Sequence, residues 1–298
     1  MIGYRWRESL DDEETRQVDE LLTAAAAFDA EAGFPTALPA KRSTGATRHI
    51  VVTIAPKGER GNAELDRLPE ADIVAYLRLE LSDGDGDVQF VVRPEFRSHG
   101  VATLLAELLD ERPDGWARVP GLRRLHVWAH GNHPAAERTA RRFGAIVEHG
   151  VFKTLRLLGG SRPYRGPSAD VRRSPAAEPP PEVVAGHRTA MAPDERAPFG
   201  HAMTRLSDVD GNGSLLVGVD AEDPAGHPAC VAVETPDAGR ELLQGLLSQA
   251  LLDVQEAGAR RAVLYVDALR ADFVSASREL AFEHDHSDFC YVRPLTDN

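Results

Sequence analysis

The sequence has few cysteines, no long apolar run and no excess of positive charge. Its only cysteines are Cys230 and Cys290, and neither belongs to a Cys-x-x-Cys pair. This argues against a disulfide framework and against a cysteine-based zinc site. We expect both to be small buried hydrophobic side chains in a reducing compartment.

The other two scarcities bear on location and partners. No apolar run approaches the length that crosses a bilayer, and the N-terminal stretch MIGYRWRESLDDEETRQ lacks the apolar core of a signal peptide. We therefore expect a cytoplasmic protein with no membrane partner. With 34 Lys+Arg against 47 Asp+Glu, the net charge is −13, which makes nucleic acid an unlikely partner.

The length of 298 residues suggests two domains, and the composition shifts between them. The stretch GGSRPYRGPSADVRRSPAAEPPPE is rich in Gly, Pro, Ser and Arg, as extended linkers are. We predict an N-terminal domain over residues 1–158, a linker over residues 159–181 and a C-terminal domain over residues 182–298. The pattern strand–helix–strand–helix–strand occurs in both halves, and RRLHVWAH at Arg123 is matched by RRAVLYVD at Arg260, an offset of 137 (260 − 123).

This pattern predicts a duplicated α/β (α+β) unit. Each copy is a mixed central sheet flanked by helices, and the second copy is shortened. Among the local signals, Ser9 begins a predicted capping box for the first helix, and Asn132 is a predicted cap for a helix with Pro134 in its first turn. A further helix is expected after Gly100, running to about Glu111.

The stretch VVRPEFRSHGVATLLAELL, residues 91–109, carries the clearest functional signal. A strand ends at a proline, passes a glycine-containing loop and enters a leucine-rich helix. Such a junction presents unpaired backbone N–H groups and a positive helix end, which suit a pyrophosphate. Gly100 would permit close backbone approach and Arg97 would add charge. The stretch is neither a Walker A loop nor Gly-x-Gly-x-x-Gly.

The pattern V-x-P-x-x-R-x-x-G-V-A-x-x-L-L resembles the acyl-CoA-binding motif of the GNAT acetyltransferase superfamily. The resemblance implies acetyl-CoA as co-substrate and no metal. It implies that the acetyl-pantetheine arm is held by the backbone of Phe90, Val91 and Val92. It also implies that the pyrophosphate is held by Ser98, His99, Gly100, Val101, Ala102 and Thr103.

The tandem arrangement, the first-helix stretch DDEETR, the stretches VWAHGNHPAA and LYVD, and the terminal TDN are similar to the mycothiol synthase family. That actinobacterial family acetylates the cysteinyl amine of Cys-GlcN-Ins, and its C-terminal domain is the catalytic one. The resemblance implies a small-molecule amine acceptor, with Tyr265 in its binding site in the second domain or between the domains. We expect a monomer, with a dimer as the alternative.

The sequence departs from this pattern in its second half and at the general acid. Aligning Pro236 with Pro94 puts Gly239 at the place of Arg97 and Leu242 at that of Gly100, which removes the anion cradle. The helical position where GNAT enzymes often carry a proton-donating tyrosine holds Ala140 in the first half and Ser277 in the second.

The catalytic residues therefore stay open. Glu234, at a strand end, and His130 are candidate bases. The alternative for Glu234 is a solvated carboxylate at the end of a strand, and the alternative for His130 is a histidine with a purely structural role. Two rival functions also remain, a GNAT enzyme with another amine acceptor and a non-catalytic acyl-CoA-binding protein.

Two stretches resemble metal sites. In EHDHSD, residues 283–288, His284 and His286 have no third spaced ligand, and we interpret the stretch as a polar loop. LSDGDGDV lacks the later glutamate of a calcium loop and predicts a turn.

Overall fold

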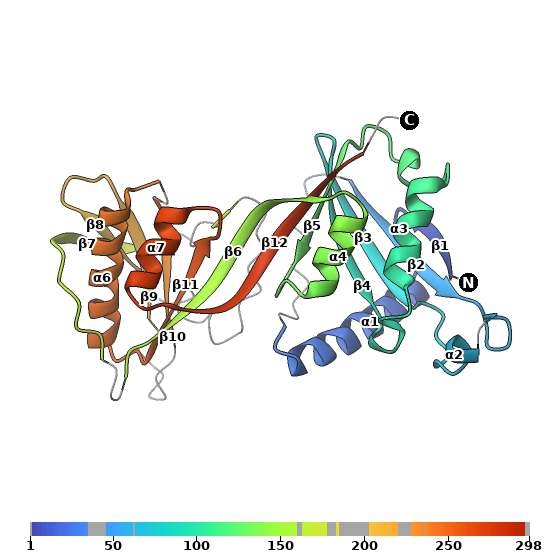
Figure 1. Cartoon of the computed structure of the whole chain (residues 1–298), viewed down its shortest axis with the longest axis horizontal. Coiled ribbons are helices and arrows are strands. Elements are labelled where there is room, and N and C mark those ends of the chain that lie inside the picture. The colour runs from blue at the N-terminus through green and yellow to red at the C-terminus, as the bar shows by residue number, and fades with distance from the viewer. Residues whose placement is uncertain are drawn as a thin grey trace. The chain divides into compact units, whose positions relative to one another are not determined.

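The computed structural model describes residues 2–34, 46–61, 63–159, 163–177, 183–184, 203–219, 228–235 and 237–295. The chain divides into two compact units (Figure 1). Unit 1 comprises Met1–Glu148 together with Cys290–Asn298, and unit 2 comprises His149–Phe289. Each unit is described by itself below.

Unit 1 is a mixed sheet with helices on both faces. Its strands follow the order β1-β2-β3-β4-β5 and then β12. Pairing is antiparallel from β1 to β4 and parallel between β4 and β5. The elements are β1 (Ile2–Arg7), α1 (Asp12–Glu31), β2 (Thr47–Ile54), α2 (Ala63–Asp66), β3 (Ala75–Ser82), β4 (Asp85–Val92), α3 (Val101–Glu111), β5 (Arg124–Ala129) and α4 (Pro134–Arg142), with short 3₁₀ turns at Pro94–Phe96 and Trp116–Arg118.

Alternating side chains give the sheet of unit 1 two apolar faces. Ile50 and Val52 of β2 belong to the core under α3, together with Leu105 and Leu109 of that helix. Val51, between them, packs on the opposite face in a cluster with side chains of α1. The parallel pair β4–β5 is therefore covered on the face that carries α3.

Two helix starts differ from the prediction by a few residues. Asp11, not Ser9, caps α1 by accepting a hydrogen bond from the N–H of Glu14 at 2.8 Å. His133, not Asn132, caps α4 through its Nδ1, with Pro134 next to it as expected. In both cases several polar residues precede the helix, and only the backbone path decides which one faces the free N–H groups.

The predicted turn at LSDGDGDV is confirmed. Asp83 and Gly84 both have positive φ, 49° and 90°, and they connect β3 to β4. Two positive φ angles in a two-residue connection match the right-handed twist of the flanking strands. The turn fixes the register of β4, the strand that leads into the glycine-containing loop.

Unit 2 repeats the alternation of strands and helices. Its strands follow the order β6-β11-β10-β9-β8-β7. The helices pack on a core built around Leu247, Leu251 and Phe273. The elements are β6 (Ile146–Leu157), β7 (Val171–Ala176), β8 (Met203–Asp208), β9 (Ser214–Gly218), β10 (Pro228–Val233), α6 (Arg240–Glu256), β11 (Arg261–Asp267), α7 (Ala271–Glu279) and β12 (Glu283–Pro294).

The division into units differs from the predicted boundaries. Strands β6 and β12 each contribute residues to both units. The first segment of unit 1 therefore ends at Glu148 rather than at residue 158, and a second segment of unit 1 begins at Cys290. Sequence patterns mark where a strand lies but not which sheet its two halves join.

The predicted linker also differs from its expectation over the described residues. Its residues 171–176 form β7, which pairs with β8, and Tyr164 is buried in the core of unit 2. The Tyr164 hydroxyl donates to Ser248 Oγ at 2.7 Å. Residues 160–162 and 178–181 of that prediction lie outside the described residues.

The expectation of a polar loop at 283–288 is wrong, because β12 begins at Glu283. Lys153 of β6 pairs with Asp285 at 3.0 Å, so polar side chains of this strand are held by partners on the neighbouring strand. Within the described residues, no helix is long and apolar enough to cross a membrane.

Candidate functional site

The parallel strands β4 and β5 part before β4 ends. Their pairing runs from Asp85 opposite Arg124 to Val88 opposite Val127 and goes no further. On its other edge, β4 stays paired with β3 as far as Val92. The edge of β4 that faces β5 is therefore not paired with β5 over Phe90, Val91 and Val92. The Val92 carbonyl accepts a hydrogen bond from Arg97 Nε, and the other backbone groups on this edge can hydrogen-bond a ligand.

The loop after β4 has alternating backbone handedness. Ser98 and Gly100 have positive φ, 64° and 79°, and His99 between them does not. Alternation of this kind turns successive N–H groups toward one side and forms a concave anion site. The ring of His99 is fixed by a 2.7 Å contact between its Nδ1 and the Arg97 carbonyl.

Gly100 is the N-cap of α3, and the first helical hydrogen bond runs from the Leu104 N–H to the Gly100 carbonyl at 2.9 Å. The N–H groups of Val101, Ala102 and Thr103 consequently have no partner within the helix. A Cβ at Gly100 would meet no heavy atom within 4 Å. The space in front of the helix end is open, and the predicted pyrophosphate residues lie together around it.

Arg97 does not add free charge to this site. One of its guanidinium nitrogens donates to Asp29 of α1, a second donates to the other Asp29 oxygen at 3.2 Å, and its Nε donates to the Val92 carbonyl at 3.1 Å. The guanidinium also lies over the ring of Phe28. Arg97 ties the loop to α1, and the anion site depends on backbone N–H groups instead.

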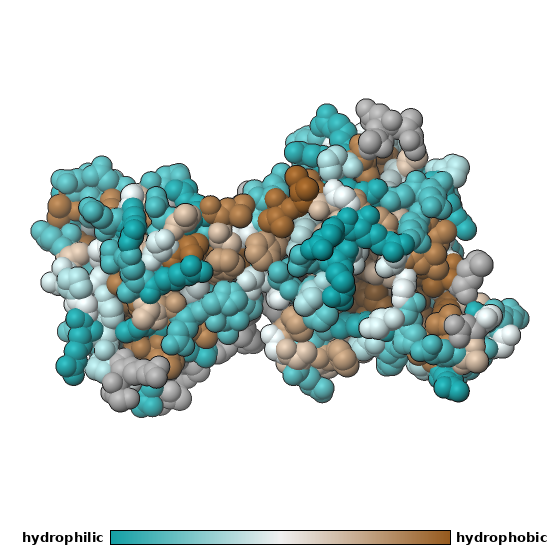
Figure 2. Space-filling model, viewed as in Figure 1, coloured by the Kyte–Doolittle hydropathy of each residue, from teal (hydrophilic) through white to brown (hydrophobic). Residues whose placement is uncertain are grey.

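A cavity of about 370 Å³ lies between α3 and α4 on the sheet of unit 1. Most of its lining is apolar, and Figure 2 shows hydrophobic residues between the polar outer faces of these helices. The ion pair between Arg142 and Glu107 joins the two helices outside it. Phe90 of the open strand edge and Ala102 of the first turn of α3 both line the cavity, so the cavity adjoins the start of α3.

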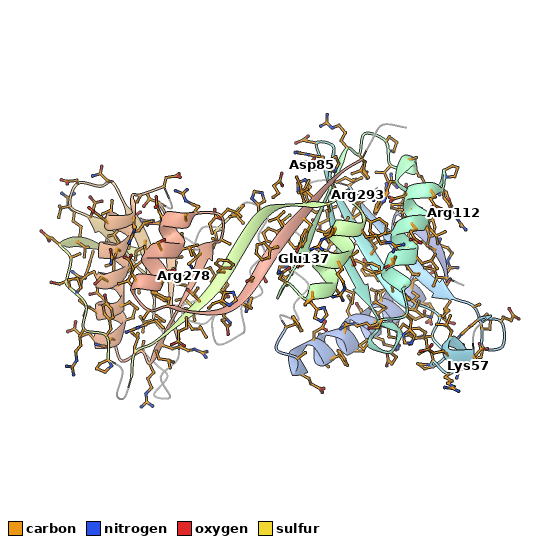
Figure 3. All side chains as sticks on the ribbon, in the orientation of Figure 1. Lys57, Asp85, Arg112, Glu137, Arg278 and Arg293 are labelled. Carbon is orange, nitrogen blue, oxygen red and sulfur yellow. The ribbon has the colours of Figure 1, made fainter. Side chains whose placement is uncertain are left out.

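The last strand of the chain supplies side chains to this cavity. Tyr291 and Arg293 of β12 line it together with side chains of α4, among them Ala136 and Ala140, and Figure 3 labels Arg293 near the end of the strand. The Tyr291 hydroxyl donates to Asn132 Oδ1 at 3.0 Å, and Arg293 Nη1 donates to Asp110 of α3 at 2.7 Å. Burial, followed by the charge of Glu137, raises the pKa of Tyr291.

Sequence reasoning missed both residues. The alternation in FCYVRP, residues 289–294, places Tyr291 and Arg293 on one face of a strand, and this could have been inferred from the sequence. Nothing local indicates that this strand lies in the sheet of the first domain.

The corresponding loop of unit 2 has a different geometry. Gly239 is the N-cap of α6 with φ −59°, so it lacks the left-handed conformation of Gly100. Both Gly239 and Gly100 are N-caps of the helix that follows them, so Gly239 corresponds to Gly100. This corrects the ungapped alignment, which placed Leu242 at the position of Gly100. Pro236, on which that alignment was based, lies outside the described residues. The connection between strand and helix is shorter in unit 2, residues 234–239, than in unit 1, residues 93–100, so an alignment without a gap shifts the residues of α6 out of register.

Of the remaining predicted site residues, His130 lies in unit 1, and Tyr265 and Glu234 lie in unit 2. His130 follows β5 in unit 1, half-buried, with its ring stacked on that of Trp128 at 6.2 Å between centroids. Tyr265 is buried on β11 of unit 2, opposite Lys153 of β6.

Glu234 of unit 2 accepts two hydrogen bonds from Arg205, both at 2.8 Å, and this pairing lowers the pKa of its carboxyl. A carboxylate with a lowered pKa is a weaker base. Among the described residues, no group of three or more His, Cys, Asp or Glu side chains is arranged to hold a metal ion.

Comparison with known proteins gives consistent relatives. No family model matches the chain. It is 27% identical to the mycothiol acetyltransferase of Nocardia farcinica, covering 98% of both chains. It is 28% identical to that of Paenarthrobacter aurescens, covering 97% of this chain and 95% of the relative.

Two solved structures share the fold over the full length. A tandem GNAT protein from the clavulanic acid biosynthesis pathway superposes with a TM-score of 0.55 at 16% identity, covering 100% of both chains. A GCN5-related N-acetyltransferase from Sphaerobacter thermophilus gives 0.51 at 17% identity, covering 99% of this chain and 96% of that one. The expected fold class is confirmed: the chain has the tandem-GNAT fold, and its sequence resembles the mycothiol acetyltransferases along nearly its whole length.

Proposed function

We propose that the protein transfers the acetyl group of acetyl-CoA to the cysteinyl amine of Cys-GlcN-Ins and so forms mycothiol. The acceptor is inferred from the names of the full-length relatives. The observation that supports acetyl-CoA as the acetyl donor is the open edge of β4 beside Gly100, the left-handed N-cap of α3 in unit 1.

In this proposal the pantetheine arm pairs with the backbone of Phe90, Val91 and Val92. The pyrophosphate accepts hydrogen bonds from the N–H groups of residues 98–103, where the positive end of α3 adds to their effect. The neutral amine then attacks the thioester carbonyl, and positioning of the two reactants supplies much of the rate. Tyr265 stays a prediction for the acceptor site, and His130 and Glu234 stay candidate bases, Glu234 the weaker because of its ion pair with Arg205.

The test is to incubate the purified full-length protein with acetyl-CoA and Cys-GlcN-Ins and to detect mycothiol by mass spectrometry. Gly100→Trp is the control. Product that is lost in the control supports acetyl transfer from unit 1. Product that survives the control would place the chemistry in unit 2, and acetyl-CoA binding without product would reject this acceptor.

A second candidate is a tandem-GNAT N-acetyltransferase with another small amine acceptor. The specific observation in its favour is the full-length likeness to a tandem GNAT protein of the clavulanic acid pathway, which shows this architecture outside the mycothiol enzymes. Release of the CoA thiol with another amine, and none with Cys-GlcN-Ins, would favour this candidate.

A further inference from the structure

The cavity of unit 1 contains very few groups that can exchange a proton. Among the described residues that line it, the only ionisable side chains are Tyr291 and Arg293. Arg293 is paired with Asp110 at 2.7 Å and lies over the ring of Phe143, and a guanidinium keeps its proton at any physiological pH. Tyr291 is therefore the side chain in the cavity that can give up a proton.

Tyr291 is fixed by a hydrogen bond near the end of β5, past the point where β4 and β5 stop pairing. It is 7% exposed, and its hydroxyl donates to Asn132 Oδ1 at 3.0 Å. Asn132 lies between the end of β5 and the start of α4, with a positive φ of 41°. The phenol thus reaches the carboxyl end of β5, beyond the last β4–β5 pair at Val88 and Val127.

Thioester aminolysis expels a thiolate, which an apolar cavity solvates poorly. Ala140 lines the same cavity and offers no donor, and the hydroxyl of Thr139 is donated to the carbonyl of Ala135 at 2.9 Å. A phenol can turn about its C–O bond from Asn132 toward a neighbouring sulfur without moving its ring.

We propose that Tyr291, carried by the last strand of the chain, is the proton donor to the CoA sulfur in unit 1. The inference rests on the proposed binding of acetyl-CoA along the open edge of β4. The amine nitrogen forms a bond to the carbonyl carbon, the C–S bond breaks, and the sulfur takes the phenolic proton. The nitrogen releases one proton to water, and water returns a proton to the phenolate, so one proton moves in total from nitrogen to sulfur.

The experiment compares three variants of the full-length protein with the wild type. Tyr291→Phe removes the donor and keeps the ring. Asn132→Gly breaks the same hydrogen bond, keeps the phenol and tolerates the positive φ. Tyr4→Phe removes another hydroxyl of unit 1, one that bonds Asp114 away from the cavity. The measurements are release of the CoA thiol with Cys-GlcN-Ins, acetyl-CoA dissociation constants and the solvent deuterium isotope effect on kcat.

We expect Tyr291→Phe to lower kcat about 100-fold, the usual effect of losing a general acid, with acetyl-CoA affinity unchanged and the isotope effect altered. Asn132→Gly should keep far more activity, and Tyr4→Phe should match the wild type. Unchanged kcat in Tyr291→Phe, lost cofactor affinity in that variant, or equal losses in Tyr291→Phe and Asn132→Gly would each overturn the assignment while leaving the proposed function standing. Wild type that binds acetyl-CoA and releases no thiol would instead reject the proposed function, and the role of Tyr291 with it.

Discussion

Replacing Gly100 by tryptophan tests whether backbone N–H groups at the start of α3 hold the pyrophosphate. Gly100 has φ 79°, and its Cβ position is open for 4 Å. A Cβ there meets no heavy atom of the described residues within 4 Å, and the tryptophan ring would stand in the proposed anion site. The left-handed backbone alone should reduce the free energy of unfolding by about 1–2 kcal/mol.

The loss of ligand affinity should be larger than the loss of stability. If the side chain prevents two hydrogen bonds to a charged oxygen, each worth about 1.5 kcal/mol, the dissociation constant of acetyl-CoA rises by roughly 100-fold. Isothermal titration calorimetry at fixed salt measures this change, and chemical denaturation measures stability.

Gly121 provides a matched control. It has φ 76°, it too has no heavy atom within 4 Å of a Cβ, and it lies in unit 1 outside the cavity lining. Gly121→Trp should show a similar stability loss with unchanged acetyl-CoA affinity. Wild-type affinity in Gly100→Trp, or equal affinity losses in both variants, would refute the placement of the pyrophosphate.

Four further outcomes follow from described contacts. Tyr164→Ala should lower the free energy of unfolding by about 3 kcal/mol because Tyr164 is core rather than linker, and no change in a urea titration would contradict this. Glu234→Gln should keep kcat within about tenfold because the carboxylate is held by Arg205, whereas a loss of about 100-fold or more would restore Glu234 as the base. Burial, with the charges of Glu148 and Asp87, raises the pKa of Cys290 from 9.0 to about 12, so native protein should resist thiol reagents at pH 8. Because the unfolded thiol ionises first, the stability this group contributes should fall from about pH 9 to pH 12, as pH-dependent denaturation would show.

The strand–loop–helix junction before α3 could be predicted closely from local chemistry. A strand, a proline, a glycine and a leucine-periodic segment occur within a few residues of one another, and the helix begins and ends where that pattern places it, at Val101 and Glu111. Handedness at Gly100 is also a local property, since glycine is the residue that adopts it without strain. The role of Arg97 was not local, because Asp29 on a distant helix determines where its charge goes.

The second loop shows the limit of reading one half from the other. Residues 234–239 are fewer than residues 93–100, and a sequence pattern alone gives no reason to place the gap before Gly239. Only the helix caps reveal the correspondence. The ungapped alignment placed Leu242 at the phosphate. In the structure its side chain instead lies next to Gly213 of unit 2, 2.9 Å from where a Cβ of that glycine would be.

The sequence by itself determined the fold class, the strand–loop–helix junction at Gly100 and the presence of two units, because these depend on short-range periodicity, turn chemistry and helix starts. Tertiary structure alone decided that β4 and β5 part after Val88, that β12 enters the sheet of unit 1, and that Tyr291 and Arg293 line the cavity there. The reason is physical: residue alternation fixes which face of a strand a side chain occupies, whereas strand neighbours are chosen by pairing between segments far apart in the chain. Tyr291 reaches Asn132, 159 residues away in the sequence, because β12 lies beside β5 in the sheet of unit 1.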